Sequence, residues 1–113
     1  CREGGRKVRY CNGKDEASKS EIHFDGSKTK PVASFAPNSL GLYDMSGNVR
    51  EWTCSEYKRN YHGSEQKCAV SASKYSLRGG SWFFDPRCVR AAFCFNYGPD
   101  TRSSVVGFRL AQG

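Results

Sequence analysis

Every apolar run in this sequence is short, and this limits the folds that the chain can adopt. Strand-favouring aromatic and β-branched residues come in brief runs, which 12 glycines and 4 prolines separate. Glycine populates turn conformations and proline cannot donate a ladder hydrogen bond, so both residues interrupt regular structure. The pattern of a long amphipathic helix is absent. The sequence therefore predicts loop-rich β or α+β structure.

The length of the chain sets the size of its core. A chain of 113 residues has room for one domain, which buries about 60–70% of the surface of its unfolded chain. We therefore expect residues 1–113 to form a single domain with one modest core. The sequence shows neither a bilayer-length apolar stretch nor a secretion signal, so we expect no membrane insertion. The chain opens at Cys1 without an initiating Met, which indicates a fragment or a processed piece.

The net charge of +7 raises the question of nucleic-acid binding. Clustered Lys and Arg side chains neutralise phosphates and release counterions. Here the basic residues alternate with acidic ones, as in Lys14-Asp15-Glu16 and Lys19-Ser20-Glu21. No stripe of one sign forms, so we expect a solvated surface and no nucleic-acid partner.

The cysteine content favours an oxidising compartment. The chain has 6 cysteines, an even and large number for its length. They allow about 15 pairings, among which the sequence does not choose. No CxxC motif is present and both histidines lie far from any cysteine pair, so we expect no structural zinc. The cysteines are Cys1, Cys11, Cys54, Cys68, Cys88 and Cys94.

Turn and strand signals divide the chain. Residues 1–36 are polar and irregular, with turns predicted at Asn12-Gly13 and Asp25-Gly26, and we expect them to be surface loops over a core. Residues 49–57 predict a strand with Trp52 and Cys54 on one face.

Two further strands are predicted towards the C-terminus. Residues 75–77 lead into Arg78-Gly79-Gly80-Ser81-Trp82, which is typical of a strand with a glycine-permitted bulge. In residues 106–111, Val106, Phe108 and Leu110 alternate with smaller or polar residues. This alternation predicts a strand with one buried face.

Three motifs in this order resemble the sulfatase-modifying, formylglycine-generating enzyme family. They are Asn38–Trp52, which contains Gly47-Asn48-Val49-Arg50-Glu51-Trp52, then Arg78–Trp82, then Gly107–Leu110. The resemblance implies an α+β, C-type-lectin-like fold, rich in loops and held by a short antiparallel sheet. It also implies that the chain is the C-terminal portion of a longer domain, so the N-terminal portion of that domain is an expected partner.

The resemblance further implies a calcium site beside the Gly47–Trp52 motif. Its ligands would be the Asp44 side chain, the Gly47 and Val49 carbonyl oxygens and the Glu51 carboxylate. Calcium accepts several oxygen ligands in an irregular shell, so a tight loop suits it. The alternative is a plain turn, in which Asp44 caps the loop and Glu51 pairs with an arginine.

The copper chemistry of the family is not matched by this sequence. The resemblance places the first copper-binding cysteine just after the Gly-Gly-Ser-aromatic motif, where this chain has Phe83, Phe84 and Asp85. Thiolates are needed because Cu(I) is a soft cation. Cys88 and Cys94 are displaced from the family positions and are predicted to form a disulfide or to be two buried thiols. We expect no copper and no enzyme activity. The alternative is a copper-dependent oxidase acting on a protein cysteine.

Residues 83–105 resemble the variable region of proteins diversified by diversity-generating retroelements, many of which share this scaffold. In those proteins, mutation of adenines in Asn codons cannot yield Lys, Glu, Gln, Met or Trp. None of the five occurs at the positions that we predict to vary and to bind ligand. These positions are Phe83, Phe84, Asp85, Cys88, Phe93, Cys94, Phe95, Asn96, Tyr97, Gly98, Thr101, Ser103, Ser104 and Val105.

The variable region predicts a binding surface like an antibody paratope. A rigid scaffold would hold the backbone while the side chains differ between copies. The aromatic side chains would be exposed anchors, and the alternative is that they fill the core. The expected ligand is a protein or another surface, met outside a bacterial cell, on its surface or on a phage particle. A third hypothesis is a structural family member without a retroelement. The predicted anchors are Phe83, Phe84, Phe93, Phe95 and Tyr97, and the predicted buried contacts are Trp52, Trp82, Ala91, Phe108 and Leu110.

Overall fold

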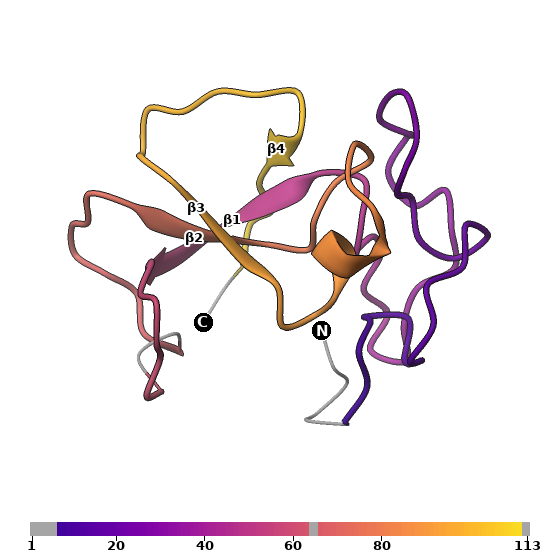
Figure 1. Ribbon diagram of the computed structural model, residues 1–113, viewed down its shortest axis with the longest axis horizontal. Coiled ribbons are helices and arrows are strands. Elements are labelled where there is room, and N and C mark those ends of the chain that lie inside the picture. The colour runs from indigo at the N-terminus through magenta and orange to yellow at the C-terminus, as the bar shows by residue number, and fades with distance from the viewer. Residues whose placement is uncertain (1–6, 64–65, 112–113) are drawn as a thin grey trace.

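The computed structural model describes residues 7–63 and 66–111 of the chain. A small curled sheet lies at the centre, with the N-terminal loops on one side of it and the loop after residue 97 arching over one end (Figure 1). Within the described ranges, no helix has both the length and the apolar composition that crossing a membrane requires.

Four strands and one short helix form the regular structure of the described residues. A 3-10 helix, η2, lies between the second and third strands and covers Pro86–Val89. No α-helix occurs in these residues, because glycines, prolines and short apolar runs interrupt every stretch that is long enough. The strands are β1 (Arg50–Glu56), β2 (Tyr75–Arg78), β3 (Cys94–Tyr97) and β4 (Val106–Gly107).

The sheet has the strand order β3-β2-β1-β4 and is mixed. β1 pairs antiparallel with β2, and β2 with β3. β4 pairs parallel with β1, through Arg50 with Val106 and Glu51 with Gly107. The expectation of a wholly antiparallel sheet is therefore wrong at this edge. A parallel neighbour needs a crossover connection, and the loop from β3 to β4 supplies it (Figure 1).

The predicted strand at residues 49–57 and the one that starts at Tyr75 are confirmed as β1 and β2. The register pairs Trp52 with Leu77 and Leu77 with Phe95, so these three side chains share one face of the sheet. Leu77 is 1% exposed. The alternation of buried and exposed positions therefore places the aromatic residues of β1 and β3 beside each other.

The glycine pair after β2 has a different role from the predicted bulge. Gly79 and Gly80 have φ angles of +96° and +66°, and β2 already ends at Arg78. A Cβ atom on Gly80 would collide with the carbonyl of Cys88. The irregularity of the sheet lies instead in β1, between Trp52 and Glu56. The glycines therefore turn the chain away from the sheet and let it approach η2 closely.

The core is small, as the length predicts, but the segment that supplies most of it is unexpected. It consists of Tyr10, Ile22, Phe24 and Val89. Three of these four residues come from residues 1–36, so the prediction that this segment only forms surface loops is wrong. A sheet of short strands offers too little area to form a core alone, so the N-terminal loops pack their few apolar side chains against Val89.

The predicted strand at residues 106–111 is mostly absent. β4 covers only Val106–Gly107, and Phe108 and Leu110 are 74% and 91% exposed. The prediction that both are buried is therefore wrong. β4 lies at the edge of the sheet, where no further described strand pairs with it. Trp52, Trp82 and Ala91 are half-buried rather than buried.

The predicted turns and the oxidised state of some cysteines agree with the structure. Gly13 and Asp25 adopt positive φ angles of 78° and 47°. Cys54 and Cys68 form a disulfide that encloses the polar loop after β1. Cys11 is also disulfide-bonded. The prediction for Cys1 lies outside the described residues.

Candidate functional site

Backbone hydrogen bonds hold both ends of the predicted variable region. The amide of Trp82 donates to the Asn48 carbonyl at 2.8 Å, and the amide of Asp25 donates to the Phe84 carbonyl at 2.8 Å. At the other end, the amide of Arg50 donates to the Val105 carbonyl at 2.7 Å. Residues 83–105 are therefore fixed to the remainder of the fold at both ends without using their side chains.

η2 supports the first part of this region. The Asp85 carboxylate caps η2 by accepting from the Arg87 amide at 2.8 Å, and it also accepts from the Arg87 guanidinium at 2.9 Å. The hydrogen bond from the Arg87 side chain and, to a smaller extent, the one from the Arg87 amide lower the pKa of Asp85 below its ordinary value. The cap fixes the first turn, because it satisfies an amide that has no partner within the helix. Val89 at the end of η2 is 0% exposed and anchors the region in the core.

The predicted variable positions share intermediate or high exposure. None of the 14 is fully buried, whereas Val89, which lies among them and is predicted to be constant, is completely buried. Phe83 is 63% exposed. The other predicted aromatic anchors, Phe84, Phe93, Phe95 and Tyr97, are half-buried. These rings neither fill the core nor stand fully in solvent.

The structure brings some of the predicted binding residues together and separates others. Phe95 and Tyr97 lie on one face of β3 with ring centroids 5.2 Å apart, and Tyr97 is 6.4 Å from Trp52 of β1. Because side chains alternate along a strand, Cys94 and Asn96 point to the opposite face.

A second group of predicted rings lies before η2. The ring of Phe83 is in contact with those of Trp82 and Phe84, with centroids 5.8 and 5.4 Å away. Ser104 lies near this group, because its carbonyl accepts from the Trp82 indole at 3.2 Å. Phe93 lies outside both groups of rings within the described residues.

Arg50 connects the two groups of rings, and the sequence analysis did not identify it. Its guanidinium carbon lies 3.9 Å from the ring centroid of Phe84 and 3.9 Å from that of Phe95. Its Nη1 donates to the Tyr97 hydroxyl at 3.5 Å, while its Nε is buried without a partner. The missed signal is a charged residue two positions before Trp52, on the apolar face of a predicted strand.

Burial changes the electrostatics of Arg50. The residue is 2% exposed, and its removal from water lowers the pKa of the guanidinium, an effect that Tyr97 and Cys88 oppose. None of the ion pairs between described residues includes Arg50. Arginine nevertheless remains charged in proteins. The two ring faces therefore supply the stabilisation that a carboxylate usually gives.

The four predicted calcium ligands come together around one cavity. Asp44, Gly47, Val49 and Glu51 all line an open space of about 350 Å³ beside β4. Arg109 also lines it and donates to both Glu51 oxygens, with contacts between 2.6 and 3.0 Å. The same guanidinium donates to the Tyr43 carbonyl at 2.9 Å.

This arrangement does not fit a calcium ion as it stands. Arg109 already neutralises Glu51, and one oxygen of Asp44 caps the loop by accepting from the Ala33 amide at 2.8 Å. A calcium ion would have to displace Arg109. The geometry corresponds to the alternative of a capped turn with an arginine pair, and the calcium site stays a prediction.

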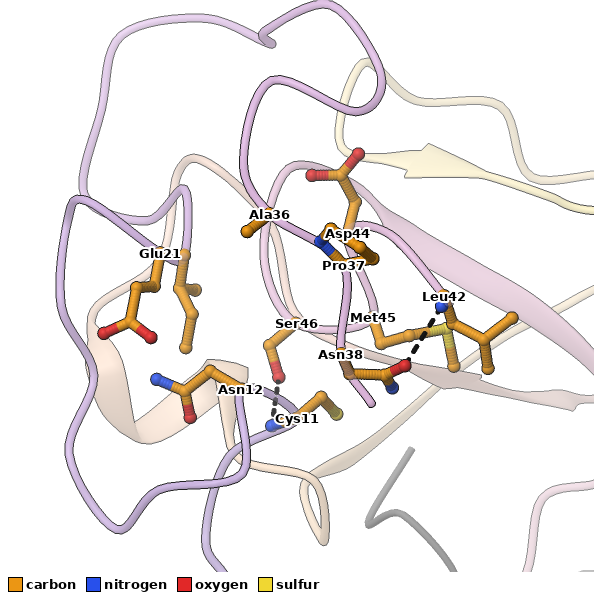
Figure 2. A pocket seen from close by; sticks show the side chains of 11 residues that line it. Cys11, Asn12, Glu21, Ala36, Pro37, Asn38, Leu42, Asp44, Met45 and Ser46 are labelled. Carbon is orange, nitrogen blue, oxygen red and sulfur yellow. Dashed lines mark hydrogen bonds between the residues drawn. The ribbon is translucent and has the colours of Figure 1, made fainter. Parts of the chain in front are cut away.

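The other side of this turn contains a second, smaller cavity of about 70 Å³. Figure 2 shows that Ser46 faces Cys11, whose amide donates to the Ser46 hydroxyl at 3.2 Å, while the Asp44 carboxylate points away from this contact. Asn38 shapes the cavity wall, because its side-chain oxygen accepts from the Leu42 amide at 3.0 Å (Figure 2). The turn therefore separates the Asp44 carboxylate from the Cys11 side of the fold.

Cys88 and Cys94 are free, half-buried thiols. The Cys94 sulfur lies 3.8 Å from the Tyr61 hydroxyl, on the face of the sheet opposite to Phe95. Cys88 lies near Arg50 and acts on its pKa. The sequence analysis left open a disulfide or two buried thiols. The structure has two thiols without a disulfide, which are half-buried and have different neighbours.

Comparison with known proteins agrees with the motifs. Residues 1–113 match the model of the sulfatase-modifying factor enzyme 1-like domain. The serine/threonine-protein kinase pkn1 of Chlamydia caviae is 34% identical over 97% of this chain and 19% of its own length. The inactive Cα-formylglycine-generating enzyme 2 of Bos taurus is 36% identical over 87% of this chain and 31% of its own length.

Among solved structures, variable protein 1 of Treponema denticola has a TM-score of 0.69 and 33% identity over 80% of this chain and 35% of that chain. This neighbour confirms the resemblance to variable proteins of diversity-generating retroelements. The chain spans only a fifth to about a third of these three relatives, as their coverages of 19%, 31% and 35% show. The motif order, the curled mixed sheet and the match over every residue lead to one conclusion: the chain belongs to the family of sulfatase-modifying factor enzyme 1-like domains.

Proposed function

We propose that this chain is the C-terminal, ligand-binding portion of a C-type-lectin-like domain without catalytic activity, and that a diversity-generating retroelement varies its binding face. The observation that carries the proposal is the accessibility of the positions that are predicted to vary within residues 83–105. All 14 positions predicted to vary are at least partly accessible, while Val89 between them is completely buried. Side chains can change at accessible positions without loss of the core.

The physical arrangement supports binding. Phe83 supplies a largely exposed ring, and Phe95 and Tyr97 lie side by side on the sheet. Aromatic side chains give a large contact area with few rotatable bonds, so ordering them on binding costs little entropy. The similarity to variable protein 1 of Treponema denticola supports the same function.

The proposed ligand is a protein or another surface, and its identity depends on which side chains a given copy carries at the variable positions. We place the protein outside a bacterial cell, on its surface or on a phage particle. The disulfide between Cys54 and Cys68 supports an oxidising location, because reducing compartments keep such cysteines free.

The family includes active formylglycine-generating enzymes, such as that of Mus musculus, and inactive members. An oxidase would need two thiolates on one copper ion. Cys94 lies beside Tyr61 on one face of the sheet, and Cys88 lies near Arg50, which shares the other face with Trp52. The two thiols thus have different neighbours, which supports a binding function over the oxidase.

Sequencing sibling copies of the gene tests the proposal. We expect substitutions confined to the 14 predicted positions, with a near-copy template in the neighbouring DNA. Substitutions spread equally over buried positions such as Val89 would contradict it. A parallel assay incubates the reduced protein with Cu(I), oxygen and a cysteine peptide. Aldehyde formation there would establish the oxidase instead.

A further inference from the structure

The Arg50 guanidinium is a buried cation whose neighbours are aromatic rings. Phe84 and Phe95 cover its two sides at 3.9 Å each, and the residue is 2% exposed. A buried charge normally requires a partner of opposite charge, because its transfer from water is costly. No carboxylate in the described ion pairs fulfils this role for Arg50, and its Nε has no acceptor. A buried hydrogen-bond donor without an acceptor, the Arg50 Nε–H, therefore lies directly beneath the binding face.

The covering rings and the covered charge belong to different parts of the chain. Phe84 and Phe95 are predicted to vary, whereas Arg50 starts β1 and lies outside residues 83–105. Its backbone is fixed by the bond of its amide to the Val105 carbonyl. The side chains at positions 84 and 95 therefore decide whether the same guanidinium is covered or open to a ligand.

We propose that Arg50 is a specificity-determining residue of the binding face. In this chain Arg50 holds Phe84 and Phe95 in place. When the side chain at position 84 or 95 no longer covers it, Arg50 becomes the anchor for a carboxylate or phosphate group of a ligand. The inference rests on the proposed function for the variation at positions 84 and 95, but the contact itself is independent of that function.

The chemistry of the guanidinium selects this class of ligand. Stacked rings cover the faces of the planar group but leave its edge, and its N–H groups lie in that plane. Oxyanions bind this edge with two parallel hydrogen bonds. Exclusion of water strengthens such a bond. The free Nε of Arg50 offers one donor, and the net charge of +7 attracts anions to the surface.

The first test removes one of the two rings that cover Arg50. The full chain and its Phe95→Ser variant are treated with phenylglyoxal, which modifies accessible arginines, and each modified arginine is located by mass spectrometry. We expect modification of Arg50 to be about tenfold faster in Phe95→Ser, in line with the loss of one cation–π contact. Inorganic phosphate should slow it, and chloride at equal ionic strength should not.

Phe83→Ser is the matched control, because Phe83 is the neighbouring ring of the same segment and its ring contacts are with Trp82 and Phe84. It should leave Arg50 protected. Equal rates in the two variants, or equal protection by chloride and phosphate, would overturn the proposal. If Phe95→Ser does not fold, Phe84→Ser removes the ring on the other side and is judged by the same outcomes.

The second test needs no substitution. In the nitrogen-15 NMR spectrum of the unaltered chain, the Arg50 Nε–H should be shifted upfield by the two rings and should exchange with water more slowly than that of exposed Arg102. Exchange as fast as that of Arg102 would overturn the proposal. Because neither test uses sibling genes, failure here is distinguishable from failure of the proposed function.

Discussion

Replacement of Arg109 by Met should lower the free energy of unfolding by about 2 kcal/mol. The substitution keeps the aliphatic stem and removes a guanidinium that contacts both Glu51 oxygens and the Tyr43 carbonyl. Hydrogen bonds to charged groups contribute about 1.5–3 kcal/mol, and a fully exposed pair contributes about 0–1 kcal/mol. The side chains of Arg109 and Glu51 are 37% and 20% exposed, so solvent screening places this pair in the lower part of the first range.

Thermal unfolding measured by tryptophan fluorescence gives the magnitude. In a chain of this length, each kcal/mol shifts the Tm by about 4 °C, so we expect a decrease of about 8 °C. Lys14→Met is the matched control, because Lys14 and Glu21 form a pair of similar length, 2.9 Å, with exposures of 61% and 33%. Its Tm should fall by less than about 4 °C.

The same assay with EDTA or calcium chloride separates the two models of this turn. If Arg109 neutralises Glu51, neither reagent should change the Tm of the unaltered chain. A Tm that calcium raises and EDTA lowers, together with an Arg109→Met variant as stable as the control, would refute the role of Arg109. It would support the predicted calcium ligands Asp44, Gly47, Val49 and Glu51.

Two further predictions concern the binding region. Phe83→Ala should reduce binding to any ligand selected with this chain and leave the Tm nearly unchanged, because the ring is 63% exposed; a large loss of Tm would place Phe83 in the structural core. Asp85→Asn should reduce stability to the full extent above the ordinary Asp pKa, which is about 3.9, and progressively less below it. The pKa of Asp85 is depressed in the folded chain, so its stabilising effect is present at neutral pH and is lost as the pH falls through that lower value. Tm differences between the parent and Asp85→Asn from about pH 2 to pH 7 test this, and a difference that grows towards acid pH would contradict it.

Local signals account for much of what the sequence predicted correctly. β1 and the start of β2 follow from short apolar alternation, and Gly13 and Asp25 occupy turns because these residues tolerate positive φ. The family follows from motifs of contiguous residues, which need no knowledge of distant contacts. Of the five aromatic anchors that were predicted to be exposed, Phe83 is exposed and the other four are half-buried.

Contacts between distant residues decided the rest. The sequence could not show that Tyr10, Ile22 and Phe24 form the core with Val89, or that Phe108 lies exposed after a two-residue strand. Arg50 and Tyr97 are separated by 47 positions, and Arg109 and Glu51 by 58. The sequence by itself determined the family and the local turns. Only the tertiary structure decided which buried or paired partner each charge received, because such pairing depends on how distant segments are brought together in space.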